Sequence, residues 1–426
     1  MTDSASTDSG GDDLYASFEE FNAAMGGGVR DPHQMLADVR AESPLLVGGF
    51  ADMMAVLGTG RTDGDADLGA LIGDDVTGAV ALSYDLVQEV LRDGNTFSSA
   101  LYALFMGPLM GHSILEMDEP EHHRYRGLIQ KAFTRKAMER WETELVKPIC
   151  HGLIDNFAER GNTDLAREYT FWFPINVIAG LLGLPAEDLS RFHRLAVELI
   201  SGPFMPERGQ QASSELRTYF ATILDARRAE PADDLISDLA QVEMDGEKLT
   251  DEEIFSFLRL LLPAGAETTY RSSGNLLYGL LSNPDQLEAV RADRTLIPRA
   301  IEEGIRWEPP LTAIIRTSTR DVELAGTPLP VGSVVVAHLG AANRDPARWE
   351  EPDRFDIFRD PKTHASFALG PHTCLGMHLA RMETGVALEA LLDRLPDLRL
   401  DPGDQDPHIT GLGFRSPTSL PVRFQA

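Results

Sequence analysis

Hydrophobic residues recur every three or four positions through most of the chain, and this helical period dominates from about Glu119 onward. Such a period places apolar side chains on one face of a helix, so it predicts several helices packed on a shared core. The segments with the clearest period are residues 121–134, 142–160, 176–184, 186–200 and 375–395.

One further helix is predicted to begin at Asp251, because Thr250 and Glu253 form a capping-box pair at its start. Its continuation through residues 255–266, FSFLRLLLPAGA, is apolar on nearly every side. We expect a helix of that kind to cross the interior of the protein. Pro263 removes a backbone donor and Gly265 weakens the helix beside it, so the helix should bend or widen at this point.

Short strands account for the rest of the pattern. Residues 78–99 predict a strand followed by a short helix, and residues 313–346 predict short strands separated by Gly and Pro turns. We therefore expect a mainly α fold with minor β sheets, formed by residues 31–426 as a single large domain. Residues 1–30 are acidic and expected to be poorly ordered, and residues 46–78 form an unusual acidic insertion rich in Gly and Asp.

Composition narrows the class of protein. The 426 residues carry 38 basic and 67 acidic side chains, and the resulting net charge of −29 argues against a nucleic-acid partner. The most hydrophobic stretch, residues 171–186, is shorter than the about 20 residues that cross a bilayer. The first twenty residues lack a secretory signal, and two cysteines do not make a disulfide framework. We expect a soluble, cytoplasmic protein with no membrane partner.

The most specific chemistry lies in residues 367–376, FALGPHTCLG, which place Cys374 in a glycine-bracketed turn just before a predicted helix. The helix dipole and local N–H groups there favour the thiolate form. One use of such a thiolate is as a ligand to haem iron. The alternative is a lone reactive thiol in a protein without haem. The other cysteine, Cys150, is predicted to be a small buried apolar residue.

Glu267 and Thr268 lie in the apolar interior helix, beside the break that Pro263 predicts. A carboxylate and a hydroxyl next to freed backbone carbonyls can form a proton-delivery pair. The alternative is structural: the two threonines, Thr268 and Thr269, bond back to carbonyls, and Glu267 pairs with an arginine.

Several other charged residues indicate a function only when they are considered together. Glu303 and Arg306 lie three residues apart on one helical face, and Arg354 could join them in a buried network. His122, Arg126, Arg316 and His372 are scattered, and each alone is an ordinary surface or capping residue. A cofactor with two carboxylates would give these four basic groups a common purpose.

Together these motifs resemble the cytochrome P450 family, of the soluble bacterial type, over roughly residues 80–426. Phe367, Gly370, Cys374 and Gly376 meet the family's F-x-x-G-x-x-x-C-x-G signature. The same order of motifs is kept by the E-x-x-R pair Glu303 and Arg306, by the P-x-R-F arginine Arg354, and by the A-G-x-[D/E]-T-T run at residues 264–269. One departure is Ala368, where the family often has glycine.

The resemblance implies a role for each matching residue. Cys374 would be the thiolate ligand of haem b, with Phe367 and Gly376 beside it, and His122, Arg126, Arg316 and His372 would bind the haem propionates. Glu303, Arg306 and Arg354 would hold the haem-binding core together. Glu267 and Thr268 would govern proton supply. The implied activity is a monooxygenase reaction, with electrons from NAD(P)H through a ferredoxin reductase and a ferredoxin.

The resemblance also places a substrate pocket among mostly apolar residues. The residues concerned are Phe105, Met106, Met110, Phe204, Leu262, Ala266, Ala313, Ile314 and Phe414. They predict a hydrophobic, neutral substrate of terpenoid, steroid, aromatic or alkyl type. Two other functions fit the same scaffold, namely a peroxide-driven peroxygenase and a non-catalytic haem-thiolate protein that binds a ligand.

Overall fold

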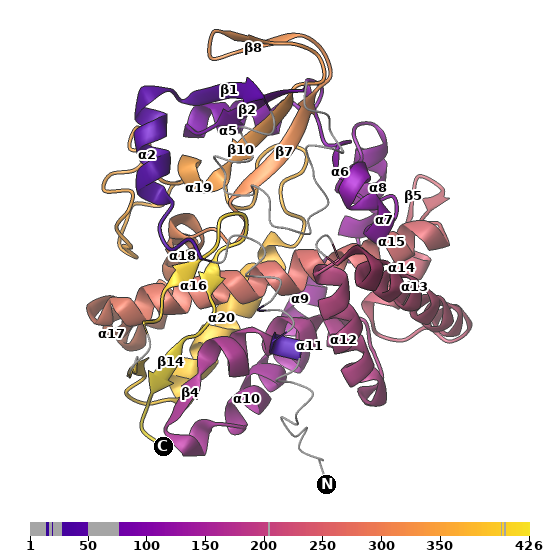
Figure 1. Cartoon of the computed structure of the whole chain (residues 1–426). Coiled ribbons are helices and arrows are strands. Elements are labelled where there is room, and N and C mark those ends of the chain that lie inside the picture. Colours follow the sequence, from indigo (N-terminus) through magenta and orange to yellow (C-terminus); the bar gives the residue numbers. More distant parts are fainter. Residues whose placement is uncertain are drawn as a thin grey trace.

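The computed structural model describes residues 14–16, 19, 28–49, 76–202, 205–401, 403 and 406–426. Within them, helices form most of the molecule, and a small sheet with its own short helices lies at one side (Figure 1). The mainly α prediction with minor sheets is confirmed. No helix among these residues is long and apolar enough to cross a membrane.

The largest sheet is built from strands that are distant in sequence. Its order is β1-β2-β10-β7-β3, in which β2 and β10 run parallel and the other pairs run antiparallel. Every residue of β10, VVVAH, is buried, as expected for a central strand covered on both faces. The strands are β1 Leu45–Gly49, β2 Thr77–Ala81, β3 Phe97–Ser98, β7 Ala313–Ser318 and β10 Val334–His338.

The remaining strands form small sheets at the periphery. Strands β11, β14 and β4 pair side by side, and three hairpins pair β5 with β6, β8 with β9, and β12 with β13. The bounds are β4 Asn162–Asp164, β5 Glu243–Met244, β6 Glu247–Lys248, β8 Val322–Leu324, β9 Thr327–Leu329, β11 Arg399–Leu400, β12 Ile409–Thr410, β13 Ser416–Pro417 and β14 Pro421–Arg423.

The helices fall into those that flank the main sheet and those that form the larger helical body (Figure 1). The first group is α2 His33–Glu42, α5 Tyr84–Arg92 and α19 Leu339–Ala342. The second is α6 Tyr102–Phe105, α7 Gly107–Met110, α8 Glu121–Gln130, α9 Arg135–Trp141, α10 Lys147–Asp155, α11 Trp172–Leu181, α12 Leu189–Ile200, α13 Pro206–Ala229, α14 Leu235–Gln241, α15 Asp251–Leu261, α16 Thr268–Ser282, α17 Pro284–Ala292, α18 Ile297–Trp307 and α20 Met377–Arg394.

The interior helix predicted from the sequence runs through the middle of the helical part. Figure 1 shows α15 and α16 crossing the molecule, and most residues of both are buried. The predicted capping box is present at Thr250 and Glu253. Between the two helices, residues Leu262–Glu267 form a π-helical turn, η5, at the point where Pro263 lacks an N–H. The predicted widening of the helix is therefore confirmed.

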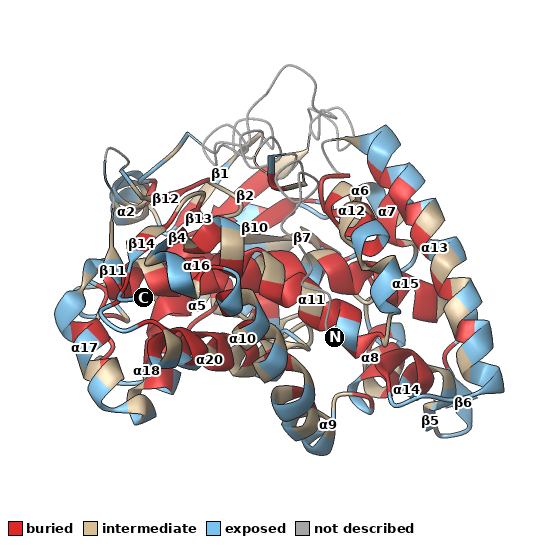
Figure 2. Ribbon diagram, turned by 90° about the horizontal axis from the view of Figure 1, so that it is seen from below, coloured by how far each residue is buried: buried red, intermediate tan, exposed pale blue. Residues whose placement is uncertain are grey.

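The hydrophobic core lies along this interior helix. Figure 2 shows buried residues along α11, α16, α18 and α20, with exposed residues on the outer faces of α13 and α17. One apolar cluster joins α10, α11, α16, α18 and α20, and it contains the buried thiol of Cys150, as predicted. A second cluster fills the space between α12, α13 and α15.

The N-terminal segment differs in part from its prediction. Residues 14–16 form a helical turn, and Tyr15 is 4% exposed among Phe171, Val197 and Tyr270. The Tyr15 hydroxyl donates to the carbonyl of Thr418 at 2.6 Å. This turn therefore packs on the core through Tyr15, with Leu14 partly buried in the same cluster. Most of residues 1–27 and residues 50–75 of the predicted insertion lie outside the described residues.

A buried carboxyl group in α20 generates a prediction about pH. Glu383 is 3% exposed and has no ion pair with a described residue, and burial raises its pKa to about 8. The folded state therefore holds a proton that the unfolded state releases above about pH 4.3. Between about pH 4.3 and about pH 8, the free energy of unfolding should therefore fall as the pH rises, by up to about 1.4 kcal/mol per pH unit.

Replacing Glu383 by Gln should remove this contribution, because glutamine does not titrate. Urea unfolding of both proteins at several pH values measures the difference. Parallel pH profiles for wild type and Glu383→Gln would contradict the prediction.

Candidate active site

The turn that carries Cys374 is fixed by its backbone. The Cys374 N–H donates to the carbonyl of Phe367 at 2.8 Å, which closes the turn on itself. Gly370 has φ +77°, and a Cβ there would stand 2.4 Å from the carbonyl oxygen of Leu91, so only glycine fits. Ala368, the departure from the family pattern, has φ +55° in the left-handed region that favours glycine.

The sulfur of Cys374 lies where α20 begins. Its side chain is exposed, yet enough protein surrounds it that burial raises the pKa of the thiol. The N–H of Gly376 and the guanidinium groups of Arg126 and Arg381 oppose that rise. A metal ion bound to this sulfur would deprotonate it outright. Phe367 packs beside the turn, with the Arg381 guanidinium 4.5 Å from its ring centroid.

Four basic residues predicted to share a purpose are brought together. The rings of His122 and His372 lie 4.1 Å apart, and Arg316 and Arg126 are close enough to act on His372. Burial, followed by Arg316, His122 and Arg126, lowers the pKa of His372 to about 3. The four residues come from β7, α8 and the cysteine turn, so only the tertiary structure makes them neighbours.

In the described part of the chain, the two arginines of this cluster lack the carboxylate partners that a buried positive charge needs. Among the described residues, Arg126 and Arg316 have no ion pair, although Arg316 is only 3% exposed. The Nε2 atom of His122 is buried without a hydrogen-bond partner, and its Nδ1 lies 3.2 Å from Glu119. An arrangement of this kind fits a ligand with two carboxylates, as haem has.

The predicted acid and alcohol both have partners in the structure. The Thr268 hydroxyl donates to the carbonyl of Ala264 at 2.7 Å. Glu267 is 4% exposed and forms an ion pair with Arg271 at 2.9 Å. Burial raises the pKa of Glu267, and Arg271 opposes that rise. These contacts of Thr268 and Glu267 match the structural alternative stated for them above.

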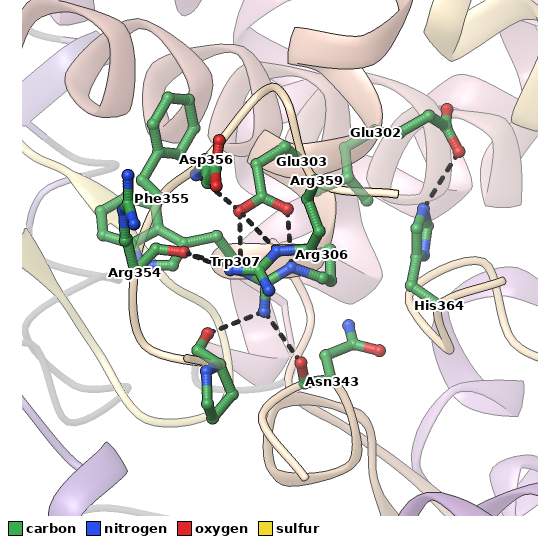
Figure 3. A network of polar contacts seen from close by, with 12 residues as sticks. Glu302, Glu303, Arg306, Trp307, Asn343, Arg354, Phe355, Asp356, Arg359 and His364 are labelled. Carbon is green, nitrogen blue, oxygen red and sulfur yellow. Dashed lines mark hydrogen bonds and ion pairs between the residues drawn. The ribbon is translucent and has the colours of Figure 1, made fainter. Parts of the chain in front are cut away.

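Glu303 and Arg306 form the predicted pair at the centre of a larger network (Figure 3). Both are buried, and Arg306 donates to the two carboxylate oxygens of Glu303 at 2.7 and 2.8 Å. Its other donors reach the carbonyls of Asn343 at 3.0 Å and Pro352 at 2.8 Å. The pair is therefore fully bonded, as a buried pair must be.

The prediction that the Arg354 side chain joins this pair is wrong. That side chain is 59% exposed and pairs with Glu351 on the surface. Only the Arg354 carbonyl takes part, by accepting from Arg306 at 3.2 Å. Arg359 occupies the inner position instead, with its Nε 3.5 Å from Glu303 and a side chain 13% exposed (Figure 3). The chain turns between these residues, which directs Arg354 outward and Arg359 inward.

The predicted pocket residues divide into two groups. Phe105, Met106, Ala313, Ile314 and Phe414 are partly exposed, and Phe414 stacks on Arg271 at 5.2 Å. Met110, Leu262 and Ala266 are instead buried in the cluster between α12, α13 and α15. Phe204 lies outside the described residues.

The π-turn explains part of this difference. Because it inserts an extra residue into the helix, it rotates the side chains that follow. Ala264 rather than Ala266 is the exposed residue of η5. Sequence reasoning also missed Arg271 and Arg359. The i,i+4 spacing of Glu267 and Arg271 could have indicated the first, whereas no local signal identifies the second.

The comparisons with known proteins agree with this geometry. Residues 203–420 match the family described as cytochrome P450. The chain is 39% identical over 326 residues to cytochrome P450 monooxygenase PikC of Streptomyces venezuelae, covering 74% of this chain and 77% of that one. It is 38% identical over 314 residues to mycinamicin IV hydroxylase/epoxidase of Micromonospora griseorubida, covering 72% and 79%.

A solved structure gives the same result for the fold. The crystal structure of CYP109E1 from Bacillus megaterium in complex with testosterone has a TM-score of 0.81 and 32% identity to this chain. The match covers 93% of this chain and all of the other.

The network around Glu303 predicts different effects for two nearby arginines. Arg359→Ala removes a mostly buried partner of Glu303 and should cost about 1–3 kcal/mol of unfolding free energy. The matched control, Arg354→Ala, removes an exposed side chain and should stay within about 0.5 kcal/mol of wild type. Chemical denaturation measures both. Equal effects of the two substitutions would show that Arg359 has no special place in the network.

Proposed function

The chain belongs to the cytochrome P450 family, whose members bind haem through a cysteine thiolate, and we propose that this monooxygenase oxidises a hydrophobic small molecule with dioxygen. The observation that carries the proposal is the position of Cys374. Its accessible sulfur lies at the start of α20, beside a cluster of four basic residues whose two arginines have no ion pair with a described carboxylate. Sulfur and basic cluster match the two ends of one cofactor, the iron and the propionates.

We propose haem b as the cofactor, with a role for each nearby residue. Cys374 binds the iron, and the N–H of Gly376 donates to its sulfur. His122, Arg126, Arg316 and His372 bind the propionates, which would give the buried His122 Nε2 a partner. Phe367 shields the sulfur from water and holds the turn through its carbonyl. When bound, haem supplies the oxidising chemistry, in which one oxygen atom enters the substrate and the other leaves as water.

Proton supply is the task we propose for Glu267 and Thr268. The π-turn leaves carbonyls without helical partners, and Thr268 already bonds to that of Ala264 at 2.7 Å. The Thr268 hydroxyl can therefore hold a water molecule next to the exposed side of η5. The carboxylate of Glu267 now forms an ion pair with Arg271. Glu267 can therefore pass a proton to that water molecule only after it has left Arg271 and bonded to water instead.

The same contacts support a second candidate, a peroxide-driven peroxygenase. That reaction needs no internal proton donor, and the ion pair of Glu267 and the back-bonded Thr268 are what a purely structural role would require. A non-catalytic haem-thiolate ligand carrier is the third reading. It has no specific observation in its favour.

Incorporation of labelled oxygen distinguishes these functions. The protein is supplied with isotopically labelled dioxygen, NAD(P)H, a ferredoxin reductase and a ferredoxin, together with compounds that shift its haem spectrum. A monooxygenase yields labelled product, whereas a peroxygenase yields it only from labelled peroxide. A protein that oxidises none of the bound compounds under either condition would be a carrier.

We propose a hydrophobic substrate of terpenoid, steroid, aromatic or alkyl type. The partly exposed residues Phe105, Met106, Ile314 and Phe414 support it, because they offer apolar contacts and an adaptable thioether. The structural neighbour CYP109E1 holds testosterone, which is consistent with this class.

The electron donors we propose are a ferredoxin and its NAD(P)H-dependent reductase. A basic surface on α8 and α9 would receive the acidic ferredoxin, despite the net charge of −29. Lys131, Lys136 and Arg140 line a groove of about 350 Å³ there, and the Arg135 side chain is 92% exposed. Arg140 pairs with Asp233 and Arg135 pairs with Glu139, whereas Lys131 and Lys136 form no ion pair with a described residue.

The proposed proton pathway predicts the effect of Thr268→Ala. NAD(P)H consumption should continue, but product formed per NAD(P)H should fall by about tenfold or more, with peroxide released instead. Thr269→Ala, which alters the buried neighbour, is the matched control and should keep its coupling. Product and peroxide are measured against NAD(P)H. Full coupling in Thr268→Ala would exclude the hydroxyl from proton supply.

The proposed docking surface predicts the effect of charge reversal. The double variant Lys131→Glu/Arg135→Glu should slow ferredoxin-driven reduction about tenfold at low salt, with a smaller effect at high salt. The control, Arg399→Glu/Arg423→Glu, makes the same charge change on the separate sheet of β11 and β14. Stopped-flow reduction measures both rates. If the two variants behave alike, ferredoxin docks on another surface.

A further inference from the structure

The ion pair between Glu267 and Arg271 uses only one oxygen of the carboxylate. Arg271 donates from Nε at 3.3 Å and from Nη2 at 2.9 Å, and both bonds go to Oε1 of Glu267. The other oxygen, Oε2, accepts from no described residue. In the pair of Glu303 and Arg306, by contrast, both carboxylate oxygens are bonded. Glu267 can therefore leave its partner by releasing one oxygen, provided that the guanidinium is stable without it.

Arg271 has other partners that can stabilise it when Glu267 leaves. Its Nη1 donates to the hydroxyl of Ser416 at 3.0 Å, and its guanidinium lies 5.2 Å from the ring centroid of Phe414 and 5.8 Å from that of Tyr270. Bulk water cannot take this role, because Arg271 is 2% exposed. Hydrogen bonds and cation–π contacts offset part of the cost of a buried charge without its anion. Tyr270, Phe414 and Ser416 thus form a cage around the guanidinium.

The segment that carries Ser416 is held by two tyrosines. The Tyr270 hydroxyl donates to the carbonyl of Pro417 at 3.4 Å, and the Tyr15 hydroxyl donates to the carbonyl of Thr418 at 2.6 Å. Burial raises the pKa of Tyr15 well above its usual value, so this hydroxyl keeps the proton that it donates. The position of Ser416 therefore depends on a residue of the interior helix and on a residue near the start of the chain.

Tyr15 is itself fixed by contacts with the core. Its ring lies edge-on to that of Phe171 at 5.1 Å, and the Arg167 guanidinium lies 5.0 Å from its centroid. Arg167 also pairs with Glu19 at 3.0 Å, which ties the same segment down a second time. Figure 1 shows this turn, in indigo, beside α11. The acidic N-terminal segment thus reaches the interior helix next to Arg271.

We propose that Tyr15 is a positioning residue for proton supply, which acts through Ser416 on the ion pair of Glu267. With Tyr15 bonded to the carbonyl of Thr418, Ser416 keeps Nη1 of Arg271, and the guanidinium stays in its cage when Glu267 turns to water. Without this bond, residues 416–418 move, Arg271 loses Ser416, and it holds Glu267 more tightly. The inference rests on the proposed function and extends its site to the N-terminal segment.

The test uses the holoprotein with Tyr15→Phe, Ser416→Ala and the double variant. Product formed per NAD(P)H should fall about 2- to 10-fold in each single variant, which is the range for the loss of one hydrogen bond. The haem-thiolate spectrum should not change. The double variant should match Ser416→Ala alone, because Tyr15 acts through Ser416. The matched control is Tyr219→Phe, which removes a hydroxyl bonded to Asp188 at 2.7 Å and should keep its coupling.

Infrared spectroscopy of the ferric protein gives a readout that is independent of turnover. The carboxyl band that disappears in Glu267→Gln belongs to Glu267, and its intensity is followed against pH. Tighter pairing with Arg271 favours the carboxylate, so the pH at which Glu267 takes up its proton should fall in Tyr15→Phe and in Ser416→Ala. The Tyr219→Phe control should titrate like wild type. A residue that only stabilised the fold would leave this titration unchanged.

Wild-type coupling and an unmoved Glu267 titration in Tyr15→Phe would overturn the proposal. Additive losses of coupling in the double variant would also overturn it, because Tyr15 would then act by another route. A protein without a haem-thiolate spectrum, or full coupling in Thr268→Ala, would fail the proposed function instead. In either of those cases the infrared titration still decides whether Tyr15 positions Glu267.

Discussion

The buried ion pair of Glu303 and Arg306 is the interaction on which the arrangement of the site depends. All the N–H donors of Arg306 bond to Glu303 or to backbone carbonyls of the segment from Asn343 to Arg354. Asn343 in turn bonds to Ser366 at 2.7 Å, directly before the cysteine turn. One charged pair thereby connects α18 to the segment that ends in Cys374. The hydrogen bonds of the pair offset the free-energy cost of burying its charges, so the loss of any one of them would be destabilising.

Charge is distributed in a way that links the fold to its chemistry. The chain is strongly acidic, yet among the described residues six arginines are buried beside seven acidic side chains, and four of those arginines have ion pairs with carboxylates. Arg316 is buried without an ion pair among the described residues, and the propionates of the proposed haem would supply the missing anion.

Local sequence signals predicted the parts of the structure that depend on local chemistry. The capping box at Thr250, the break at Pro263 and the turn around Gly370 follow from backbone constraints that a few neighbouring residues impose. Contacts between distant segments could not be predicted in this way. Arg359 rather than Arg354 meets Glu303 because of the path of the chain, and Tyr15 is buried only because α12 and α16 create a place for it.

The central claim is that Cys374 binds haem iron as a thiolate. The most direct test is the absorption spectrum of the reduced protein with carbon monoxide, recorded for wild type and for Cys374→Ser. The account predicts the long-wavelength Soret band of a thiolate-ligated haem in wild type and its loss in the variant. A wild-type band where globins absorb, unchanged by the substitution, would contradict it.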